Sequence, residues 1–388
     1  MPAMIEAQVP SEAFRRAVFF VAGFDVVGPR FYRLMFKREL AQDSARIQRR
    51  FGLVELPHRP PAAWGCSIAT SDGPRPVEVE YHVLTPHELV SRSYIRNAAT
   101  VAWNWLRVVL AYIWHGIAWR TFATSWKTGL VMVYVLAMPL AAYLAGAAAV
   151  GTALYWASPA APPAIAILGG FAAGFLTLQL VIAMDRGAGP NLLLSSMAVG
   201  LDQAAGRLPA FDKIVDDFAR FVIERGAAAR WDEILVIGHS SGGIMAVDVV
   251  ARVLDRSDLA ARTRLALLTL GSTHGIITFC RHARRQRAAF ARVATAPEVV
   301  WNEYFTARDF IGLGRRDPIA AARIELGGNQ QTGPRIRRLS LSEFYSRERI
   351  RRLRFSFFDR HFDYLKAGDR NSAYSYFRMV CGAAPLAR

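Results

Sequence analysis

A serine framed by two glycines is the feature of this chain best suited to chemistry. Ser240 lies in Gly238-His239-Ser240-Ser241-Gly242, after the apolar run 234–237 and before apolar residues at helical spacing from Ile244. A G-x-S-x-G segment between a strand and a helix forms a strained turn that lifts the serine hydroxyl to the end of a sheet. The pattern predicts that Ser240 is a nucleophile, with an ordinary structural turn as the alternative.

The segments around this serine indicate an α/β protein. Runs typical of strands occur at residues 17–22, 77–83, 234–237, 265–270, 298–305 and 350–357. Helical segments are expected from Pro29 to about residue 50 and at 211–225. Strands that alternate with helices predict a parallel sheet with helices on both faces. Residues 323–348 have no clear pattern, so a lid, an extra strand and a loop stay open for them.

With these elements around it, the Ser240 segment resembles the nucleophile turn of the α/β-hydrolase superfamily, a group of esterases, lipases and related acyl hydrolases. The resemblance covers about residues 15–85 and 205–370. It implies an α/β-hydrolase parallel sheet with flanking helices, and a catalytic triad in the chain order Ser, then Asp or Glu, then His.

That order selects the partners of the serine. The histidines that follow it are His274, His282 and His361. His361 comes after the expected last strand, so the resemblance implies that it is the general base. Asp309 follows the second strand after the nucleophile, where the family places the carboxylate that orients the imidazole. A structural ion pair between Asp309 and Arg308 is the alternative, and Asp317 is the second candidate acid.

An oxyanion hole needs two backbone N–H groups. One is expected from Ser241, directly after the nucleophile. The other is expected from Phe24, in the turn after the first strand, where Gly23 lets the backbone approach closely. Asp25 would repel a developing negative charge, so we expect it to cap the helix near Pro29 or to pair with an arginine.

The middle of the chain predicts a membrane insertion. Residues 128–184 contain no Asp, Glu, Lys or Arg, and 130–156 and 164–184 are each long enough to cross a bilayer. The Pro-rich segment 157–163 breaks the helix between them. A buried helical hairpin inside a soluble core is the alternative. The G-x-x-x-G at 170–174 predicts close packing of the two helices.

We expect the opposing small face of the first span to be Ala141 and Ala145.

Flanking charges predict the orientation of this hairpin. The basic residues beside it are Arg107, Arg120, Lys127 and Arg186, and the connecting turn has none. The positive-inside rule therefore puts the flanking domain in the cytoplasm, on the inner membrane, with two spans. The three scattered cysteines agree with a reduced compartment, and the polar segment 1–16 has no apolar core typical of a secretory peptide.

An aromatic-rich stretch precedes the hairpin. Residues 88–126 hold five of the nine tryptophans, namely Trp103, Trp105, Trp114, Trp119 and Trp126. Because tryptophan prefers the headgroup zone, the stretch predicts an interfacial helix, with a packed helix of the soluble domain as the alternative. The expected domain boundaries are an N-terminal hydrolase part at 1–98, the interfacial helix at 99–127, the hairpin at 128–185 and a C-terminal hydrolase part at 186–388.

The net charge of +17 indicates anionic partners. With a membrane insertion in the chain, anionic lipid headgroups are favoured over nucleic acid, since no recognisable nucleic-acid module is present. Biased codon usage with a solvated surface is a third explanation. No cofactor and no metal are expected, because neither metal-ligand spacing nor a phosphate-binding glycine loop occurs.

Together these patterns predict a membrane-anchored serine hydrolase that cleaves carboxylic esters, with a lipid or acyl-ester substrate taken from the bilayer. An acyltransferase with the same triad and a non-catalytic hydrolase-like membrane scaffold are the alternatives.

Overall fold

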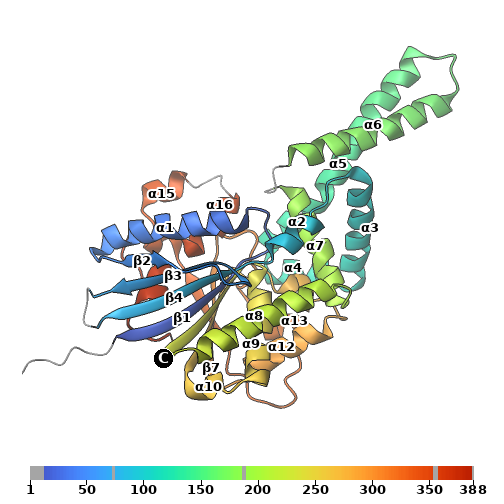
Figure 1. Cartoon of the computed structure of the whole chain (residues 1–388). Helices are drawn as coiled ribbons and strands as arrows, with labels where there is room; N and C mark the ends of the chain where they lie inside the picture. Colours follow the sequence, from blue (N-terminus) through green and yellow to red (C-terminus); the bar gives the residue numbers. More distant parts are fainter. Residues whose placement is uncertain (1–12, 72–74, 186–188, 353–356, 387–388) are drawn as a thin grey trace, which may run out of the picture.

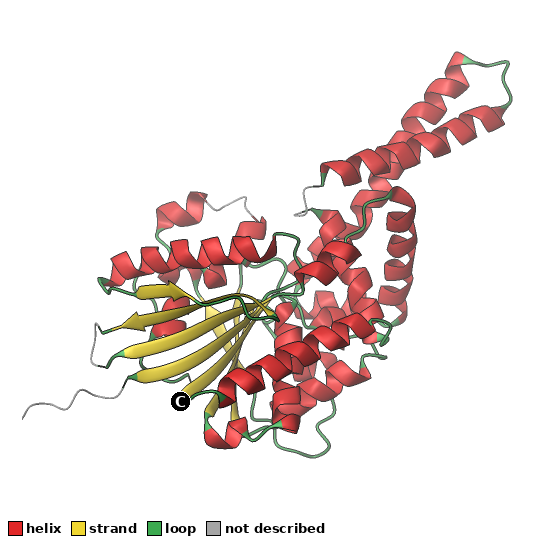
Figure 2. Cartoon of the chain, in the orientation of Figure 1, coloured by secondary structure: helices red, strands yellow, loops and turns green. Residues whose placement is uncertain are grey.

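The computed structural model describes residues 13–71, 75–185, 189–352 and 357–386. A twisted sheet lies between two layers of helices, and a long helical hairpin projects from one side of the molecule (Figures 1 and 2).

The sheet has eight strands in the order β2-β3-β4-β1-β5-β6-β7-β8. The strands are β1 (Phe14–Val21), β2 (Gly52–Glu55), β3 (Ala62–Thr70), β4 (Val77–Leu84), β5 (Glu233–His239), β6 (Arg264–Leu270), β7 (Val299–Thr306) and β8 (Arg335–Leu339). β3 runs antiparallel to both of its neighbours, and the pairings from β4 through β1 to β8 are all parallel. The predicted α/β class with a mostly parallel sheet is therefore confirmed.

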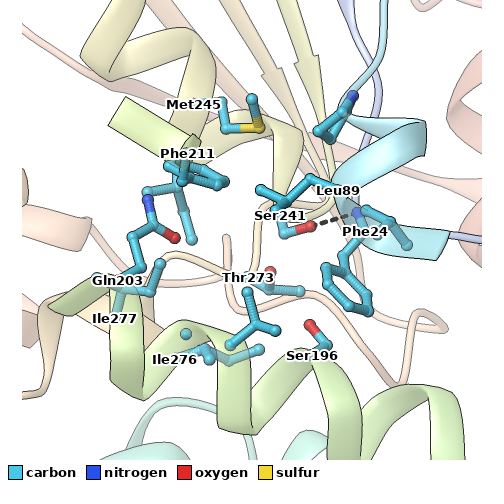
Figure 3. Close-up of a pocket in the computed structure, with 15 residues that line it drawn as sticks. Phe24, Leu89, Ser196, Gln203, Phe211, Ser241, Met245, Thr273, Ile276 and Ile277 are labelled. Carbon is cyan, nitrogen blue, oxygen red and sulfur yellow. Dashed lines mark hydrogen bonds between the residues drawn. The ribbon is translucent and has the colours of Figure 1, made fainter. Parts of the chain in front are cut away.

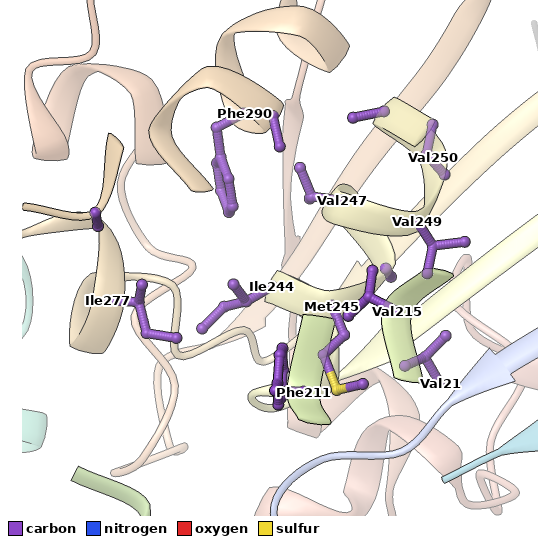
Figure 4. Close-up of a cluster of buried hydrophobic side chains, with 14 of the residues drawn as sticks. Val21, Phe211, Val215, Ile244, Met245, Val247, Val249, Val250, Ile277 and Phe290 are labelled. Carbon is purple, nitrogen blue, oxygen red and sulfur yellow. The ribbon is translucent and has the colours of Figure 1, made fainter. Parts of the chain in front are cut away.

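Helices cover both faces because the buried strands alternate their side chains between two cores. On β1, Val18 and Phe20 face α1 (Gly28–Ile47), α14 (Leu341–Phe344) and α17 (Tyr376–Cys381). Phe19 and Val21 face the other core, with α8 (Pro209–Ala227), α9 (Gly242–Arg256) and α12 (Arg284–Ala294). Figure 4 shows part of this second core, where the first turns of α9 meet side chains of α8 and α12.

The remaining short elements connect strands to helices or follow the last strand. They are α10 (Leu259–Arg262), α11 (Gly275–Thr278), α13 (Pro318–Ala322), α15 (Arg347–Arg352), α16 (Phe357–His361) and the 3-10 helix η1 (Asp363–Leu365).

The predicted strand at 350–357 is wrong. Residues 347–352 form α15, in which Ile350 is the single apolar side chain and no residue is buried. Glu348 and Arg352 form an i,i+4 ion pair, which supports a helix. Residues 353–356 of that prediction lie outside the described residues. The last strand is instead β8, inside the segment 323–348 that the sequence left open.

The edge strand β2 and its neighbour β3 were not predicted. In β3, Trp64, Cys66 and Ile68 are buried on one face. The intervening Gly65 and Ser67 weaken the alternation that identifies a strand.

The hairpin consists of α5 (Trp126–Ala157) and α6 (Pro163–Met184). Both helices are long and apolar enough to cross a membrane, and 22% of the most apolar window of each is buried. Pro139 lies inside α5 without ending it, as membrane helices tolerate.

The glycines of the hairpin allow the two helices to touch. A Cβ on Gly170 would lie 2.7 Å from the carbonyl oxygen of Ala147, and one on Gly146 would lie 2.9 Å from the carbonyl oxygen of Ala173. The predicted role of the G-x-x-x-G segment is thus confirmed, whereas the predicted partner face is wrong. Ala141 and Ala145 are exposed, and Gly146, Ala147 and Gly151 form the contact instead.

The stretch 88–126 is three helices rather than one: α2 (His87–Ser93), α3 (Ala98–Trp114) and α4 (Ile117–Thr124). Gly116 adopts a positive φ of 67° between α3 and α4, which ends the first and starts the second. One side of α3 packs in the protein core through Val101 and Val108, while Trp103 and Trp114 on other sides are 60% and 81% exposed.

α7 (Pro190–Ala204) follows the hairpin and packs against α3, α5 and α11. The helices around the hairpin base are therefore continuous with the second core of the sheet.

Candidate active site

Ser240 lies in a sharp turn between β5 and α9. Its φ of 59° is unusual for a residue other than glycine. Gly238 and Gly242 make the turn possible, because a Cβ on Gly238 would lie 2.6 Å from the carbonyl oxygen of Gly242, and one on Gly242 would lie 2.3 Å from that of Val21. These contacts are the collisions that the sequence pattern predicts, and they belong to a strained turn that presents a serine.

The turn is at the point where the chain direction across the sheet reverses. β1 and β5 are neighbours at the middle of the sheet, and the chain leaves β1 toward β4 and β2 but leaves β5 toward β6 and β7. In open α/β sheets, the crevice outside the carboxyl ends of the strands at such a point is the usual ligand site.

Asp309 and His361 meet at this same carboxyl edge. Nδ1 of His361 lies 2.9 Å from Oδ2 of Asp309 and 3.1 Å from Oδ1, and both side chains are buried. Asp309 follows β7 as predicted, whereas His361 ends the short helix α16 rather than following a strand. The structure thus brings together two residues 52 positions apart that were singled out from the sequence.

The protonation state of this pair follows from its surroundings. Burial alone would raise the pKa of Asp309. However, the charge and hydrogen bond of His361 and the amides of Ile311 and Gly312 together lower that pKa below its ordinary value. An ionised Asp309 accepts a hydrogen from Nδ1, which leaves the lone pair of the imidazole on Nε2. Nε2 of His361 is buried and has no hydrogen-bond partner among the described residues.

Tyr364 and His239 hold the pair in place, and neither was predicted to do so. The Tyr364 hydroxyl donates to Oδ2 of Asp309 at 3.0 Å and accepts from the Thr306 amide at 2.9 Å. Nε2 of His239 lies 2.7 Å from the carbonyl oxygen of His361, and the two rings are 4.8 Å apart. Burial and the neighbouring His361 lower the pKa of His239 to about 3, so its ring is neutral and Nε2 donates. These contacts join distant segments, and no local sequence signal marks them.

The other candidates lie apart from this pair. Asp317 caps α13 by accepting from the Ile319 amide at 2.8 Å. His282 packs against the ring of His115. His274 is fully buried beside Phe279, and burial lowers its pKa to about 3.

The two expected oxyanion donors come from neighbouring segments, Phe24 from the turn after β1 and Ser241 from the start of α9. The Phe24 amide donates to Oγ of Ser241 at 2.6 Å, as the dashed line in Figure 3 marks. A Cβ on Gly23 would lie 3.0 Å from Cβ of Ser240, so the turn after β1 does approach the serine closely. The Phe24 amide therefore donates to an oxygen next to Ser240 in the chain, and the Ser241 hydroxyl must move away before another oxygen can take its place.

Asp25 is held at the start of α1. Its carboxylate accepts from the Tyr32 hydroxyl and, at 3.2 Å, from the Val27 amide. Burial raises its pKa to about 6 although these hydrogen bonds oppose the shift. Asp25 thus lies just before α1, whose N-cap residue is Val27 and which has no side-chain cap hydrogen bond. The side-chain partner of Asp25 is a tyrosine, so neither the expected cap nor the expected arginine pair is found.

A second buried carboxyl group lies behind Asp309. Burial raises the pKa of Glu303 on β7 to about 7, against hydrogen bonds from Thr269 and the Ser272 amide, and the charge of Asp309 adds to the increase. Two acidic groups near one another thus have opposite pKa shifts, a pattern that is frequent at functional sites.

A narrow apolar pocket opens beside the turn (Figure 3). It is lined by Phe24, Pro86, Leu89, Val90, Ser196, Val199, Gly200, Gln203, Phe211, Ser241, Ile244, Met245, Thr273, Ile276 and Ile277. Its cavity volume of about 30 Å³ holds a water molecule or two, so a larger ligand requires the lining to move. Nε2 of Gln203 and Oγ1 of Thr273 are buried there without a hydrogen-bond partner among the described residues.

The base of the hairpin contacts the loop that carries the acid. We call residues 307–312 the acid loop. Nζ of Lys127 donates to the carbonyl oxygen of Ala307 at 2.6 Å, and Oγ1 of Thr128 donates to that of Gly312 at 3.0 Å. The first turn of α5 therefore supports the position of Asp309.

Within the described part of the chain, no group of three or more His, Cys, Asp or Glu side chains is arranged to hold a metal ion. No protein-family model, curated protein or solved structure matches this chain.

Proposed function

We propose that this protein is a membrane-anchored serine hydrolase that cleaves carboxylic esters, with an α/β-hydrolase type of site. One observation carries the proposal. A serine in a strained turn after β5 shares the carboxyl edge of the sheet with a buried Asp309–His361 pair, and Nε2 of His361 has no hydrogen-bond partner among the described residues. Serine, histidine and aspartate in this chain order and at one sheet edge are the parts of a triad.

In the proposed reaction, Ser240 Oγ attacks the ester carbonyl while Nε2 of His361 takes its proton. The ionised Asp309 holds Nδ1–H and stabilises the imidazolium. The amides of Phe24 and Ser241 donate to the oxyanion of the tetrahedral intermediate. The intermediate collapses with loss of the alcohol, which takes the proton from His361, and water then cleaves the acyl-enzyme by the same steps.

A lipidic or long-chain acyl substrate is supported by the pocket and by the hairpin. The pocket next to Ser241 is lined mainly by apolar side chains, and α7, which lines it with Val199 and Gly200, follows directly on the hairpin. The unpartnered Gln203 and Thr273 groups give a polar part of the substrate two hydrogen-bonding positions.

We place the site on the cytoplasmic face of the inner membrane, on the flanking charges alone. Arg107 and Lys127 lie beside the base of the hairpin, on α3 and α5. Arg186, the fourth flanking charge, lies outside the described residues. The connecting turn between α5 and α6 has no charge to oppose this orientation.

Ester turnover tests the activity and the substrate class together. Protein in phosphatidylcholine nanodiscs is assayed on a short soluble p-nitrophenyl ester and on a long-chain ester presented in the same bilayer. We expect both to be cleaved, with the higher kcat/KM for the bilayer substrate, and we expect His361→Ala to lose on the order of 10³-fold or more with either. Equal kcat/KM for both substrates would contradict the lipidic substrate, and unchanged rates in His361→Ala would contradict the triad.

A further inference from the structure

A pocket rich in arginine lies beside α4, and none of the predicted active-site residues lines it. It is formed by the turn between α3 and α4, by α4, by the segment after α11 and by α13, and α4 contacts both α11 and α13. Its cavity volume is about 380 Å³. The basic residues that line it are His115, Arg120, Arg281, Arg316 and Arg323.

None of the four lining arginines forms an ion pair with a carboxylate of the described residues, although arginines elsewhere in the protein do. Arg16 forms a fully buried ion pair with Glu233, and Arg252 contacts three aspartates. Around the pocket, the positive charges of the guanidinium groups repel one another. Burial and the charges of Arg323, Arg287 and Arg281 lower the pKa of Arg120.

The neighbouring Arg287 adds to the positive charge near the pocket. It donates to the carbonyl oxygens of Thr278, Ala322 and Arg323, and so fixes the backbone on which Arg323 is carried. Burial lowers the pKa of Arg287, and the negative charge of Glu325 opposes that shift. The four lining arginines therefore keep an excess positive charge that a bound anion would offset.

Two further groups suit a phosphate-bearing ligand. Nδ1 of His115 is buried without a hydrogen-bond partner among the described residues. Trp119 lines the pocket with 76% of its surface exposed, and Trp114 at the end of α3 is 81% exposed. α4 ends at Ser125, which caps α5, so the pocket is next to the start of the first candidate span.

We propose that this arginine pocket binds a phosphate group, carried either by the headgroup of an anionic phospholipid or by a free phosphate compound. Guanidinium groups match phosphate oxygens with paired hydrogen bonds, and a phosphate monoester supplies up to two negative charges where a carboxylate supplies one. The binding is independent of ester hydrolysis and of Ser240.

Binding measurements on the whole protein test this inference. Wild type is purified in zwitterionic detergent and measured by native mass spectrometry with added phosphatidic acid, and by equilibrium dialysis with radiolabelled inorganic phosphate. Retention of phosphatidic acid alone identifies a lipid headgroup, and binding of inorganic phosphate as well identifies a free phosphate compound. Either result supports the pocket.

The matched variants have equal charge. Arg316→Gln/Arg323→Gln removes two exposed pocket arginines, and Arg264→Gln/Arg338→Gln removes two exposed arginines on β6 and β8. We expect the dissociation constant to rise at least tenfold in the first and to change less than twofold in the second, with an intermediate effect in Arg120→Lys. Equal weakening in the two double variants, or no binding of either probe to wild type, would overturn the proposal.

Discussion

At the carboxyl edge of the sheet the Asp309 carboxylate is buried and has several hydrogen-bond partners, whereas many apolar side chains along α5 and α6 are exposed. The carboxylate of Asp309 accepts hydrogen bonds from His361, from Tyr364 and from two backbone amides. On α6, Ile167 and Leu168 are 69% and 67% exposed. The carboxylate of Asp309 is therefore fixed by contacts within the chain, whereas the exposed apolar side chains of α5 and α6 are compatible with contact to lipid.

Because the two regions differ in this way, mutations in each should change a different property of the protein. Substitutions at the edge should reduce the reaction while leaving the protein in the membrane. Substitutions between α5 and α6 should reduce stable insertion while leaving the reacting groups intact. The acid loop is where the two regions meet, through the first turn of α5.

The largest effect is expected at the acid. Asp309→Asn removes the charge that fixes the His361 tautomer, so kcat/KM should fall on the order of 10³- to 10⁴-fold in the ester assay. Asp317→Asn is the matched control, because that carboxylate caps α13 and should change the rate less than about threefold. Similar losses in the two variants would show that Asp309 has no special role.

A substitution at the contact between α5 and α6 should reduce the yield of folded protein and leave the reaction rate nearly unchanged. Gly170→Ile forces α5 and α6 apart, since the added Cβ would lie 2.7 Å from the carbonyl oxygen of Ala147. Overpacking of this kind costs about 1–3 kcal/mol. We expect a lower yield of monodisperse protein from membranes, measured by size-exclusion chromatography, with little change in the specific activity of the protein that folds.

Ala172→Ile is the control for this change, because Ala172 is exposed on the same helix. A loss of yield as large as that of Gly170→Ile would mean that side-chain volume anywhere on α6 is harmful, and the helix contact would not be the cause.

A smaller effect is expected where the regions meet. Thr128→Val removes the hydrogen bond to the carbonyl oxygen of Gly312 and keeps the side-chain shape. Loss of one such bond is worth about 1 kcal/mol, so kcat should fall roughly fivefold with KM little changed. A change in KM alone would indicate that α5 shapes the binding of substrate and has no part in holding Asp309.

The smallest effect on rate is expected for a substitution of Glu303. It should instead change the thermal stability of the protein in a pH-dependent way. The folded pKa of about 7 lies above the ordinary value of 4.5, so the buried group is neutral at low pH and must ionise as pH rises through 7. The cost of ionising it is therefore absent below about pH 4.5 and complete above about pH 7. Glu303→Gln should raise Tm at pH 8, by an amount equivalent to about 1–3 kcal/mol, and leave it nearly unchanged at pH 5.

A Tm difference for Glu303→Gln that is the same at pH 5 and pH 8 would contradict this account of the carboxyl group.

The sequence predicted those parts of the protein that depend on local patterns. The Ser240 turn, β1, β4 to β7 and the two apolar helices are each determined by spacing within one segment. The pairing of Asp309 with His361 was reached through chain order, and its geometry agrees. The strand expected at 350–357 failed because its described start belongs to a basic helix, in which Ile350 is the single apolar side chain and Glu348 and Arg352 form an ion pair.

Contacts between segments far apart in the chain could not be predicted from the sequence. Tyr364 donates to a carboxylate 55 residues earlier, and His239 bonds to a carbonyl oxygen 122 residues later. The arginine pocket likewise gathers α4, the segment after α11 and α13 from three separate stretches. Such groupings depend on how the elements pack, and a pattern within one stretch of chain does not encode them.

Covalent labelling in membranes tests the central claim most directly. A fluorophosphonate probe is added to membranes that contain wild type, Ser240→Ala or Ser241→Ala, and the labelled peptide is mapped by mass spectrometry. We predict a single adduct on Ser240 in wild type, none in Ser240→Ala and continued labelling of Ser241→Ala, which loses a hydroxyl but keeps its backbone amide. Folded wild type that takes no label would contradict a serine hydrolase, and labelling undiminished in Ser240→Ala would contradict Ser240 as its nucleophile.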